Sequence, residues 1–370
     1  MKIAFIALRG VPLSDGIVRV TDVVASELSK LGHDVTVYTS DRYGNINGNY
    51  NGYKIITVHA PKIGFLEKMV LTKRSAKLAV KEDFDIYHFE AMGPSYYAKI
   101  PFKKGKKVVI QSHGIEYDRP KWNWFAKFVL KTLEKKSLKY CQCLTVVSKK
   151  IKRHFLTKYN YPSLYIPNFT RNPQNGDIHL LEKYGIEANK YFLFLNRIDA
   201  GKGVHYLVNA YNEIDTTFKL VICGELVDGN EYHELIKNLA KNNPNILLMG
   251  NVDGELKNTL YENAYVCLQT SESEGMSTSL LEAMSYGRCS IVSDIEENID
   301  VAEDSAISFK STDVGDLKRC LLLAASSPDI VSNKGKSAFN IWKNNFTIEK
   351  VVNMYLEMYN QIVYETSKQN

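Results

Sequence analysis

The sequence predicts an α/β protein of two domains, each built on a mainly parallel β-sheet covered by helices. Its 370 residues exceed what one ordinary core holds and suit two domains of common size. With 45% hydrophobic and 24% charged residues, the composition is that of a globular protein. Short apolar runs alternate with helical patterns along the chain, as in parallel sheets.

The strand-like runs form two series, which define the expected domains. The first series covers residues 2–8, 35–39, 54–59, 86–89, 107–112, 143–148 and 163–167, and the second covers 191–196, 218–223, 246–252, 264–270, 289–293 and 306–309. Between them, residues 167–176 are rich in Pro, Asn and Gly and read as a linker. We therefore expect domains at 1–169 and 170–346. A final helix at about 347–370, with a wide apolar face, should pack back on the first domain.

Charge is distributed unevenly between the two halves. Residues 1–170 contain 29 basic and 13 acidic side chains, a net +16, whereas the remainder contains 18 and 28, a net −10. A basic half suits an anionic partner such as a membrane surface or a lipid-linked phosphate. A solvated basic face with no partner is the alternative interpretation.

Cysteine usage and the apolar runs bear on the compartment. The six cysteines lie in or beside strand-like runs without paired C-x-x-C spacing or neighbouring histidines, which favours reduced core thiols. The first apolar run is too short for a signal peptide, and no apolar stretch approaches bilayer-spanning length. We therefore expect a cytoplasmic protein.

The first strand leads into a turn at residues 9–16, followed by a helical pattern near Ile17. Glycine before a helix start lets backbone N–H groups approach a phosphate, so the Gly16 backbone is a candidate phosphate contact. The segment is neither G-x-G-x-x-G nor a phosphate-binding loop ending in Gly-Lys-Ser/Thr. An ordinary strand-to-helix turn explains it equally well.

Two cations follow a strand in the second half. The strand at 191–195 ends in Asn196-Arg197-Ile198-Asp199-Ala200-Gly201-Lys202-Gly203, before a helix from about Val204. Ligands of open α/β sheets lie beyond the carboxyl ends of strands. Arg197 and Lys202 could therefore neutralise a diphosphate leaving group, although exposed loop charges are the alternative.

Two acids follow the strand-like run at 264–270, in Glu274-Gly275-Met276-Ser277-Thr278-Ser279-Leu280-Leu281-Glu282. With a helix that begins near Ser277, Glu274 lies in the preceding loop and Glu282 lies more than a turn further on. One carboxylate could then hold sugar hydroxyls while the other accepts bonds from ribose hydroxyls, with N–H donors of the helix start between them. A helix capped by Ser277 that carries exposed acids is the alternative.

These motifs occur in an ordered set that also includes Ser293-Asp294 with Glu297-Asn298. The set resembles the nucleotide-sugar domain of family 4 retaining glycosyltransferases, which have the GT-B fold of two Rossmann-like domains facing a central cleft. The resemblance covers nearly the whole chain and is more specific in the C-terminal half. It implies an acceptor-binding domain at 1–169 and a nucleotide-sugar-binding domain at 170–346.

The resemblance implies roles for the matching residues. Arg197 and Lys202 would bind the diphosphate; Glu274 would bind the sugar and Glu282 the ribose. His113, which follows the strand at 107–112, matches a histidine that this family places beside the transferred sugar, although a core histidine is the alternative. The implied catalytic set is His113, Glu274, Arg197 and Lys202. The implied donor site is Gly16, Arg197, Lys202, Val252, Glu274, Gly275, Met276, Ser277 and Glu282.

The same resemblance implies the reaction. A hexose-type sugar would move from a UDP- or GDP-sugar to a glycan or lipid-linked acceptor in surface polysaccharide or lipopolysaccharide synthesis, with retention of configuration. We expect no metal, because Arg197 and Lys202 can stabilise the leaving group. We expect no cofactor besides the sugar nucleotide, which is a co-substrate.

Acceptor contacts and membrane contacts are expected in the first domain. The candidate acceptor residues are Asp15, Arg19, Glu116, Tyr117, Arg119 and Trp122. Residues 62–74 and 121–128 combine cations with apolar side chains, which is typical of peripheral binding to an anionic membrane. Helices packed on the sheet would explain the apolar side chains equally well.

Three other classes compete. A nucleotide-binding oxidoreductase requires G-x-G-x-x-G after the first strand, and that pattern is absent. A phosphorylase of related fold requires a lysine bound to pyridoxal phosphate. A nucleic-acid or other interaction protein could use the basic half, but would leave the cations and acids of the second half without a shared purpose, so we expect no nucleic-acid partner.

Overall fold

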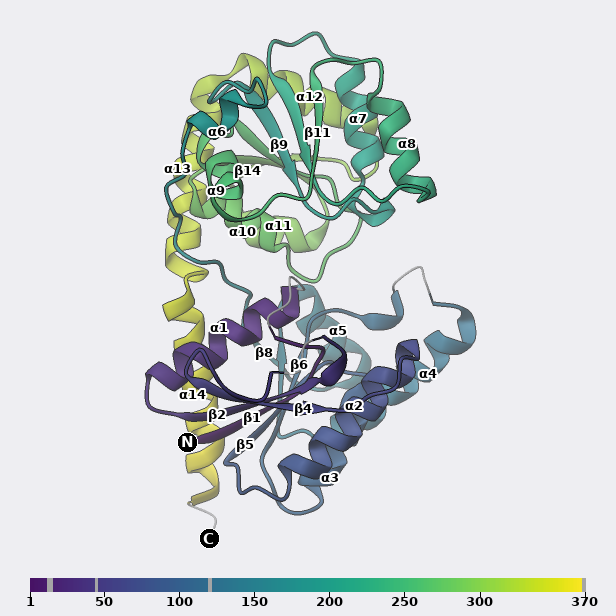
Figure 1. The fold of residues 1–370 in the computed structure, drawn as a ribbon, viewed down its shortest axis with the longest axis vertical. Helices are drawn as coiled ribbons and strands as arrows, with labels where there is room; N and C mark the ends of the chain where they lie inside the picture. Colours follow the sequence, from purple (N-terminus) through teal and green to yellow (C-terminus); the bar gives the residue numbers. More distant parts are fainter. Residues whose placement is uncertain (12–15, 44–45, 119–121, 368–370) are drawn as a thin grey trace. The chain divides into compact units, whose positions relative to one another are not determined.

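The computed structural model describes residues 1–11, 16–43, 46–118 and 122–367, and the chain divides into two compact units (Figure 1). The first unit is Met1–Asn168 together with Ile348–Asn370, and the second is Phe169–Thr347. Each unit is a mainly parallel sheet with helices, so the predicted α/β fold of two domains is confirmed.

The described part of the first unit contains an eight-stranded sheet in the order β3-β4-β2-β1-β5-β6-β7-β8. The strands are β1 (Lys2–Leu8), β2 (Asp34–Ser40), β3 (Gly48–Tyr50), β4 (Tyr53–Val58), β5 (Ile86–Glu90), β6 (Val108–Ser112), β7 (Cys143–Val146) and β8 (Leu164–Tyr165). All neighbours pair in parallel except β3 and β4. The order changes direction between β1 and β5, so the loops after these strands flank a switch point, where α/β sheets bind ligands.

The antiparallel edge strand β3 was not predicted. It pairs with β4 through a hairpin whose turn residues, Asn51 and Gly52, have φ of 48° and 91°. Positive φ at both positions is what an Asn-Gly hairpin turn requires. The Asn51-Gly52 dipeptide could therefore have been used to predict this hairpin from the sequence.

The helices of the first unit include one from the end of the described chain. They are α1 (Gly16–Lys30), α2 (Gly64–Ala79), α3 (Lys99–Phe102), α4 (Trp124–Ser137), α5 (Lys149–Tyr159) and α14 (Ile348–Ser367). Along α14 the buried side chains are Val351, Val352, Tyr355, Met358 and Tyr359. Their spacing of three and four residues makes one apolar stripe, which buries the helix within the first unit.

All residues of the second unit are described, and its six strands pair in parallel in the order β11-β10-β9-β12-β13-β14. The strands are β9 (Tyr191–Leu195), β10 (Lys219–Cys223), β11 (Ile246–Gly250), β12 (Val266–Gln269), β13 (Cys289–Ser293) and β14 (Ala306–Phe309). Along β9, Phe192 and Phe194 enter one core cluster while Tyr191 and Leu193 enter another, so the sheet is buried on both faces. The switch point lies between β9 and β12.

Most helices of this unit follow a strand directly along the chain. They are α6 (His179–Glu182), α7 (Val204–Asn212), α8 (Glu231–Ala240), α9 (Gly254–Asn263), α10 (Thr278–Ser285), α11 (Glu296–Ala302), α12 (Val314–Ser326) and α13 (Pro328–Asn345). The helix predicted near Ser277 is α10, with Ser277 as its N-cap.

The six cysteines are free thiols, and all except Cys143 are buried. Burial raises the pKa of the Cys143 thiol to about 11 and that of Cys289 to about 12. Such thiols stay protonated and unreactive at neutral pH. The prediction of reduced core thiols is confirmed.

Candidate functional site

The loop after β9 carries both predicted cations. Its first residue, Asn196, donates from Nδ2 to Ser279 Oγ at 3.0 Å and accepts the backbone N–H of Arg197 at 2.9 Å. At its end Gly203 has φ of +67°, and a Cβ there would lie 2.2 Å from the Thr270 carbonyl oxygen. Only glycine permits this close approach, which brings the loop against the end of β12.

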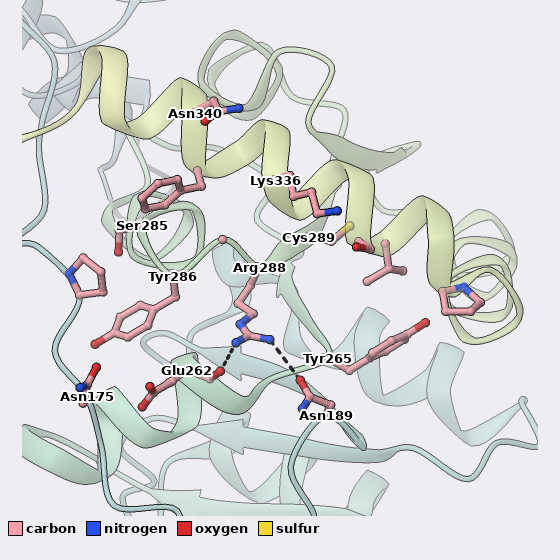
Figure 2. A pocket seen from close by; sticks show the side chains of 16 residues that line it. Asn175, Asn189, Glu262, Tyr265, Ser285, Tyr286, Arg288, Cys289, Lys336 and Asn340 are labelled. Carbon is pink, nitrogen blue, oxygen red and sulfur yellow. Dashed lines mark hydrogen bonds between the residues drawn. The ribbon is translucent and has the colours of Figure 1, made fainter.

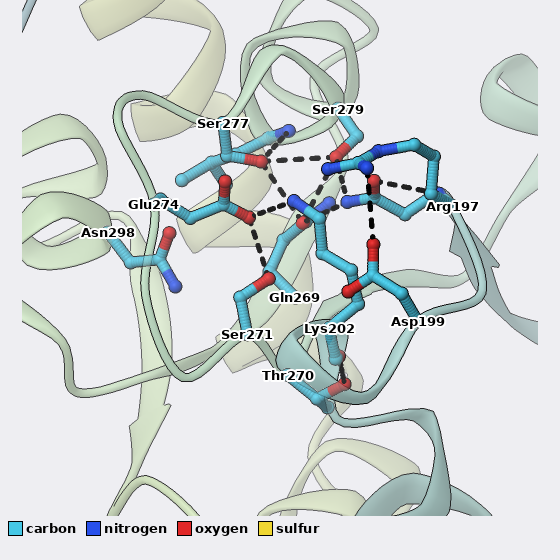
Figure 3. A network of polar contacts seen from close by, with 12 residues as sticks. Arg197, Asp199, Lys202, Gln269, Thr270, Ser271, Glu274, Ser277, Ser279 and Asn298 are labelled. Carbon is cyan, nitrogen blue, oxygen red and sulfur yellow. Dashed lines mark hydrogen bonds and ion pairs between the residues drawn. The ribbon is translucent and has the colours of Figure 1, made fainter. Parts of the chain in front are cut away.

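Lys202 and Glu274 form a nearly buried ion pair between neighbouring strand ends (Figure 3). Lys202 Nζ lies 2.5 Å from Glu274 Oε1, and the side chains are 9% and 10% exposed. The Ser271 hydroxyl donates to the same carboxylate at 2.7 Å, and the Thr270 hydroxyl donates to the Lys202 carbonyl at 2.8 Å. A charge pair so shielded is screened little by salt and is held in one geometry.

A hydroxyl and amide network fixes the start of α10 behind this pair. Ser277 Oγ accepts the backbone N–H of Leu280 at 3.3 Å and lies 3.1 Å from the oxygens of Gln269 and Ser279. Gly275 and Met276 lie between Glu274 and this cap, and Met276 is buried. The network aims the N-terminus of α10 beyond the carboxyl end of β12, where a helix end attracts anions.

The Ser293 and Asn298 motif supports the same loop from β13. Asn298 Nδ2 donates to Ser293 Oγ at 3.1 Å, and Ser293 Oγ donates to the Ser271 carbonyl at 2.5 Å. Ser271 in turn contacts Glu274, so residues from two strand ends position one carboxylate.

Arg197, Glu282 and Val252 have partners other than Lys202 and Glu274. The Arg197 side chain is 81% exposed, with Nη1 3.3 Å from Asp199 Oδ2. Glu282, on α10, pairs with Lys257 of α9 at 2.6 Å and is about one-fifth exposed. Val252 follows β11 and packs partly buried against a core cluster. The structure thus pairs Lys202 with Glu274, two of the predicted site residues. Glu282 pairs instead with Lys257, which the sequence did not indicate.

A buried histidine that the sequence analysis missed links two loops of this site. His233 Nδ1 accepts the Val227 N–H at 2.8 Å, and His233 Nε2 lies 2.7 Å from the Ile198 carbonyl oxygen, so Nε2–H is the donor. The ring therefore ties the loop after β10 to the loop that carries Arg197. Its only sequence signal was the Asn230 N-cap just before it, which marks a helix start and no function.

The first unit brings His113 against an acid that was also missed. His113 follows β6, and its Nε2 lies 2.6 Å from Oε2 of Glu90, the last residue of the neighbouring strand β5. Thr21 of α1 donates to the other oxygen of Glu90 at 3.1 Å. Burial would raise the pKa of Glu90, but its bonds with His113 and Thr21 and the nearby His88 lower the pKa overall. Glu90 is thus a buried carboxylate.

The remaining predicted residues of the first unit are placed as follows. Gly16 is the first residue of α1, and Arg19 is exposed on that helix. Glu116 and Trp122 are partly exposed. Asp15 and Arg119 lie outside the described residues.

Tyr117 is buried rather than presented to solvent. Its hydroxyl donates to Glu134 at 3.3 Å and accepts from Lys158 at 2.5 Å. Glu134, on α4, also accepts from Tyr159 at 2.7 Å. These bonds tie the segment after His113 to α4 and α5.

The second unit contains a cavity of about 940 Å³ (Figure 2), which lies at the opposite ends of the strands from the Lys202–Glu274 pair. Tyr265, Arg288 and Cys289 line it at the amino ends of β12 and β13, whereas the Lys202–Glu274 pair follows carboxyl ends. Arg288 donates to the Ala264 carbonyl and to Asn189, each at 3.1 Å, and to the Glu262 carbonyl. These bonds cap the end of α9, so Arg288 has a structural role there.

The described residues contain neither a metal-binding cluster nor a membrane-spanning helix. No group of three or more His, Cys, Asp or Glu side chains in them could hold a metal ion. No helix in them is both long and apolar enough to cross a bilayer.

Comparisons with known proteins assign the family. Residues 14–170 match the model of Glycosyltransferase Family 4, and residues 179–339 match that of Glycosyl transferases group 1. An uncharacterized glycosyltransferase of Methanocaldococcus jannaschii is 26% identical over 72% of this chain and 71% of its own.

Solved structures share the fold at low identity. Sucrose-phosphate synthase of Thermosynechococcus elongatus superposes with a TM-score of 0.84 at 17% identity, covering 98% of this chain and 99% of its own. HepE of Anabaena, solved with UDP, superposes with a TM-score of 0.80 at 14% identity, covering 98% and 100%. The chain therefore belongs to the glycosyltransferases of the GT-B type, with a family 4 domain followed by a group 1 domain.

Proposed function

We propose that the protein is a retaining, metal-independent hexosyltransferase that uses a UDP- or GDP-sugar. The observation that carries the proposal is the Lys202–Glu274 pair, together with Arg197, at the carboxyl ends of β9 and β12 on either side of the switch point. A diphosphate leaving group gains negative charge as the glycosidic bond breaks, and cations placed there stabilise that charge. Relatives solved with UDP or UDP-glucose support a uridine nucleotide as the first donor to test.

Each side chain has a proposed role. One of the three donors of the Lys202 ammonium is taken by Glu274, which leaves donors for a phosphate oxygen. Exposed Arg197 can make a bidentate contact to the same diphosphate. Glu274, held by Ser271, would accept bonds from sugar hydroxyls and position the ring rather than attack it.

Further donor contacts are proposed on other elements. Glu282 would accept the ribose hydroxyls, Val252 would lie against the base, and the N-terminus of α10 would face a phosphate. The Gly16 backbone at the start of α1 would add a phosphate contact, and His113 would act on the transferred sugar. Because cations and helix N–H groups neutralise the leaving group, no metal and no cofactor is required.

Nucleotide selectivity and product configuration test this function. Thermal stabilisation by a panel of nucleoside diphosphates and their sugars should single out one base, since ligands of the native state stabilise it by mass action. The selected donor should then transfer its sugar in the presence of a chelator, and NMR of the product should show the donor's anomeric configuration. Transfer that requires a divalent cation, or an inverted product, would contradict the proposal.

We also propose that the acceptor is a glycan or lipid-linked molecule of surface polysaccharide or lipopolysaccharide synthesis, reached at the cytoplasmic face of a membrane. On α4, Trp124, Phe125 and Phe128 are 80%, 60% and 64% exposed. Lys131 and Lys135, also exposed, follow on the same helix, so apolar side chains that can insert lie beside cations that attract anionic lipid. Ile63 and Leu66, at the start of α2, are exposed as well.

Flotation with liposomes tests this membrane contact. The protein should float with vesicles of anionic lipid at low salt and be released by high salt, and the triple change Trp124→Ser, Phe125→Ser, Phe128→Ser should abolish flotation. Leu235→Ser, at a 44% exposed site on α8 of the second unit, is the matched control and should float normally. Wild-type protein that fails to float with anionic vesicles would remove the membrane proposal and leave the transfer reaction untouched.

A further inference from the structure

A buried series of polar side chains leads from α14 across β5 to His113 within the first unit. Tyr359 of α14 and His88 of β5 come first, with the Tyr359 hydroxyl 2.6 Å from His88 Nδ1. Glu90, two residues further along β5, comes next, and its carboxylate reaches His113 at 2.6 Å. Apart from His113, which is 10% exposed, these side chains are nearly or fully buried.

The carboxylate of Glu90 determines which nitrogen of His113 carries a proton. An ionised carboxylate only accepts hydrogen bonds, so Nε2 of His113, which faces it, must be the donor. In a neutral imidazole the other nitrogen, Nδ1, is then an acceptor. The bond thus fixes both the orientation of the ring and the chemical character of the atom that it presents to a ligand.

Glu90 is a carboxylate at a position where a neutral side chain could make the same hydrogen bonds. Burying a carboxylate is costly, and a glutamine could accept the same bonds from Thr21 and His113. Behind Glu90, the Nε2 atom of His88 is buried, has no hydrogen-bond partner among the described residues, and lies 3.8 Å from Glu90 Oε1. If the Tyr359 hydroxyl donates to Nδ1, a neutral His88 carries its proton on Nε2, the ring nitrogen that lies 3.8 Å from Glu90 Oε1.

We propose that Glu90 is a positioning residue for glycosyl transfer: it holds His113 as the Nε2–H tautomer, so that Nδ1 can accept a hydrogen bond from the reacting sugar. His88 and Tyr359 support the carboxylate from the side of α14. The inference rests on the proposed function only for the role of His113 in transfer, since the Glu90–His113 contact itself belongs to the first unit alone.

Glu90→Gln is the central test. The glutamine amide can donate to Nε2 as well as accept from it, so His113 can adopt either tautomer. We expect kcat to fall by about 10- to 100-fold, the range of one misplaced hydrogen-bonding group, with the donor KM and nucleoside diphosphate affinity unchanged. His113→Ala added to Glu90→Gln should cause little further loss, because the two residues act as one unit.

Tyr355→Phe is the matched control in the same buried region. It removes the 2.7 Å bond from the Tyr355 hydroxyl to Gln111 and leaves Glu90 and His113 intact. Its kcat should stay within about twofold of wild type. A fall as large as that of Glu90→Gln would show that any buried polar change in this region slows transfer, and would overturn the specific role of Glu90.

The ¹⁵N NMR signals of the His113 ring give a readout that does not depend on activity. Neutral His113 of the wild type should show a protonated Nε2 and an unprotonated Nδ1, and Glu90→Gln should show a mixture. An Nδ1–H tautomer in the wild type, or a wild-type kcat in Glu90→Gln, would overturn the inference. Should Glu90→Gln fail to fold, Glu90→Asp, whose carboxylate is one methylene shorter, must show the same loss of kcat. If wild-type protein transfers no sugar, the proposed function fails while the NMR result still tests Glu90.

Discussion

The two units each contain an acid–base pair at the carboxyl ends of neighbouring strands, but the pairs are built differently. In the second unit, Lys202 and Glu274 both lie on loops that follow β9 and β12. In the first unit, Glu90 is the last residue of a fully buried strand, and only His113 lies on a loop. Loops adjust to a ligand more readily than buried strands do, so we predict that the second pair contacts ligand directly while Glu90 acts through His113.

The largest expected effect is the loss of kcat/KM when Lys202, a proposed direct contact to the leaving group, is changed. Lys202→Met should lower kcat/KM by about 10²- to 10³-fold, because an electrostatic contact to developing charge is lost. Steady-state kinetics with the donor selected by thermal stabilisation would measure it. Lys237→Met removes a lysine that pairs with exposed Asp228 and Glu234, and should leave kcat/KM unchanged. A loss below about threefold in folded Lys202→Met protein would place the leaving group elsewhere.

The second effect concerns stability in the first unit. Burial lowers the pKa of His88 to about 4, from an ordinary value of 6.5. The unfolded chain therefore binds a proton that the folded chain excludes between pH 6.5 and 4, so lowering the pH through this window destabilises the fold, by about 3 kcal/mol from this residue. Urea denaturation of wild type and His88→Gln across the window should show that only the wild type carries this contribution. Parallel stability curves would mean that His88 is not kept neutral by burial.

The smallest expected effect tests the other lysine–acid pair of the second unit. Glu282→Ala should weaken nucleoside diphosphate binding by roughly tenfold, the value of one hydrogen bond to a charged group, with little change in kcat at saturating donor. Titration calorimetry would measure the affinity. Glu255→Ala, at an exposed site on α9, should bind normally. Unchanged affinity in Glu282→Ala would assign the Lys257–Glu282 pair to helix packing alone.

The same contrast explains what the sequence could reveal. Runs of buried β-residues and glycine-rich breaks predicted every long strand, and Glu274 was visible because it follows such a run in a turn-forming segment. Glu90 was not visible, because it ends a buried strand and its partners Thr21 and His113 are brought to it only by the parallel pairing of β1, β5 and β6. The Lys257–Glu282 pair was missed for the same reason, since it joins two helices through tertiary packing.

The placement of α14 has a consequence for biosynthesis. Tyr355 and Tyr359 are among the fully buried side chains of the first unit, yet residues 348–367 are translated after the whole second unit. On the ribosome, synthesis of the second unit is therefore complete before that of the first unit. Until α14 is made, the first unit lacks Val351, Tyr355 and Tyr359, and the apolar surface that they cover stays exposed. Domains usually fold in order from the N-terminus. Here the order of completion is reversed, and a nascent chain that stalls before residue 348 exposes a surface open to chaperones or aggregation.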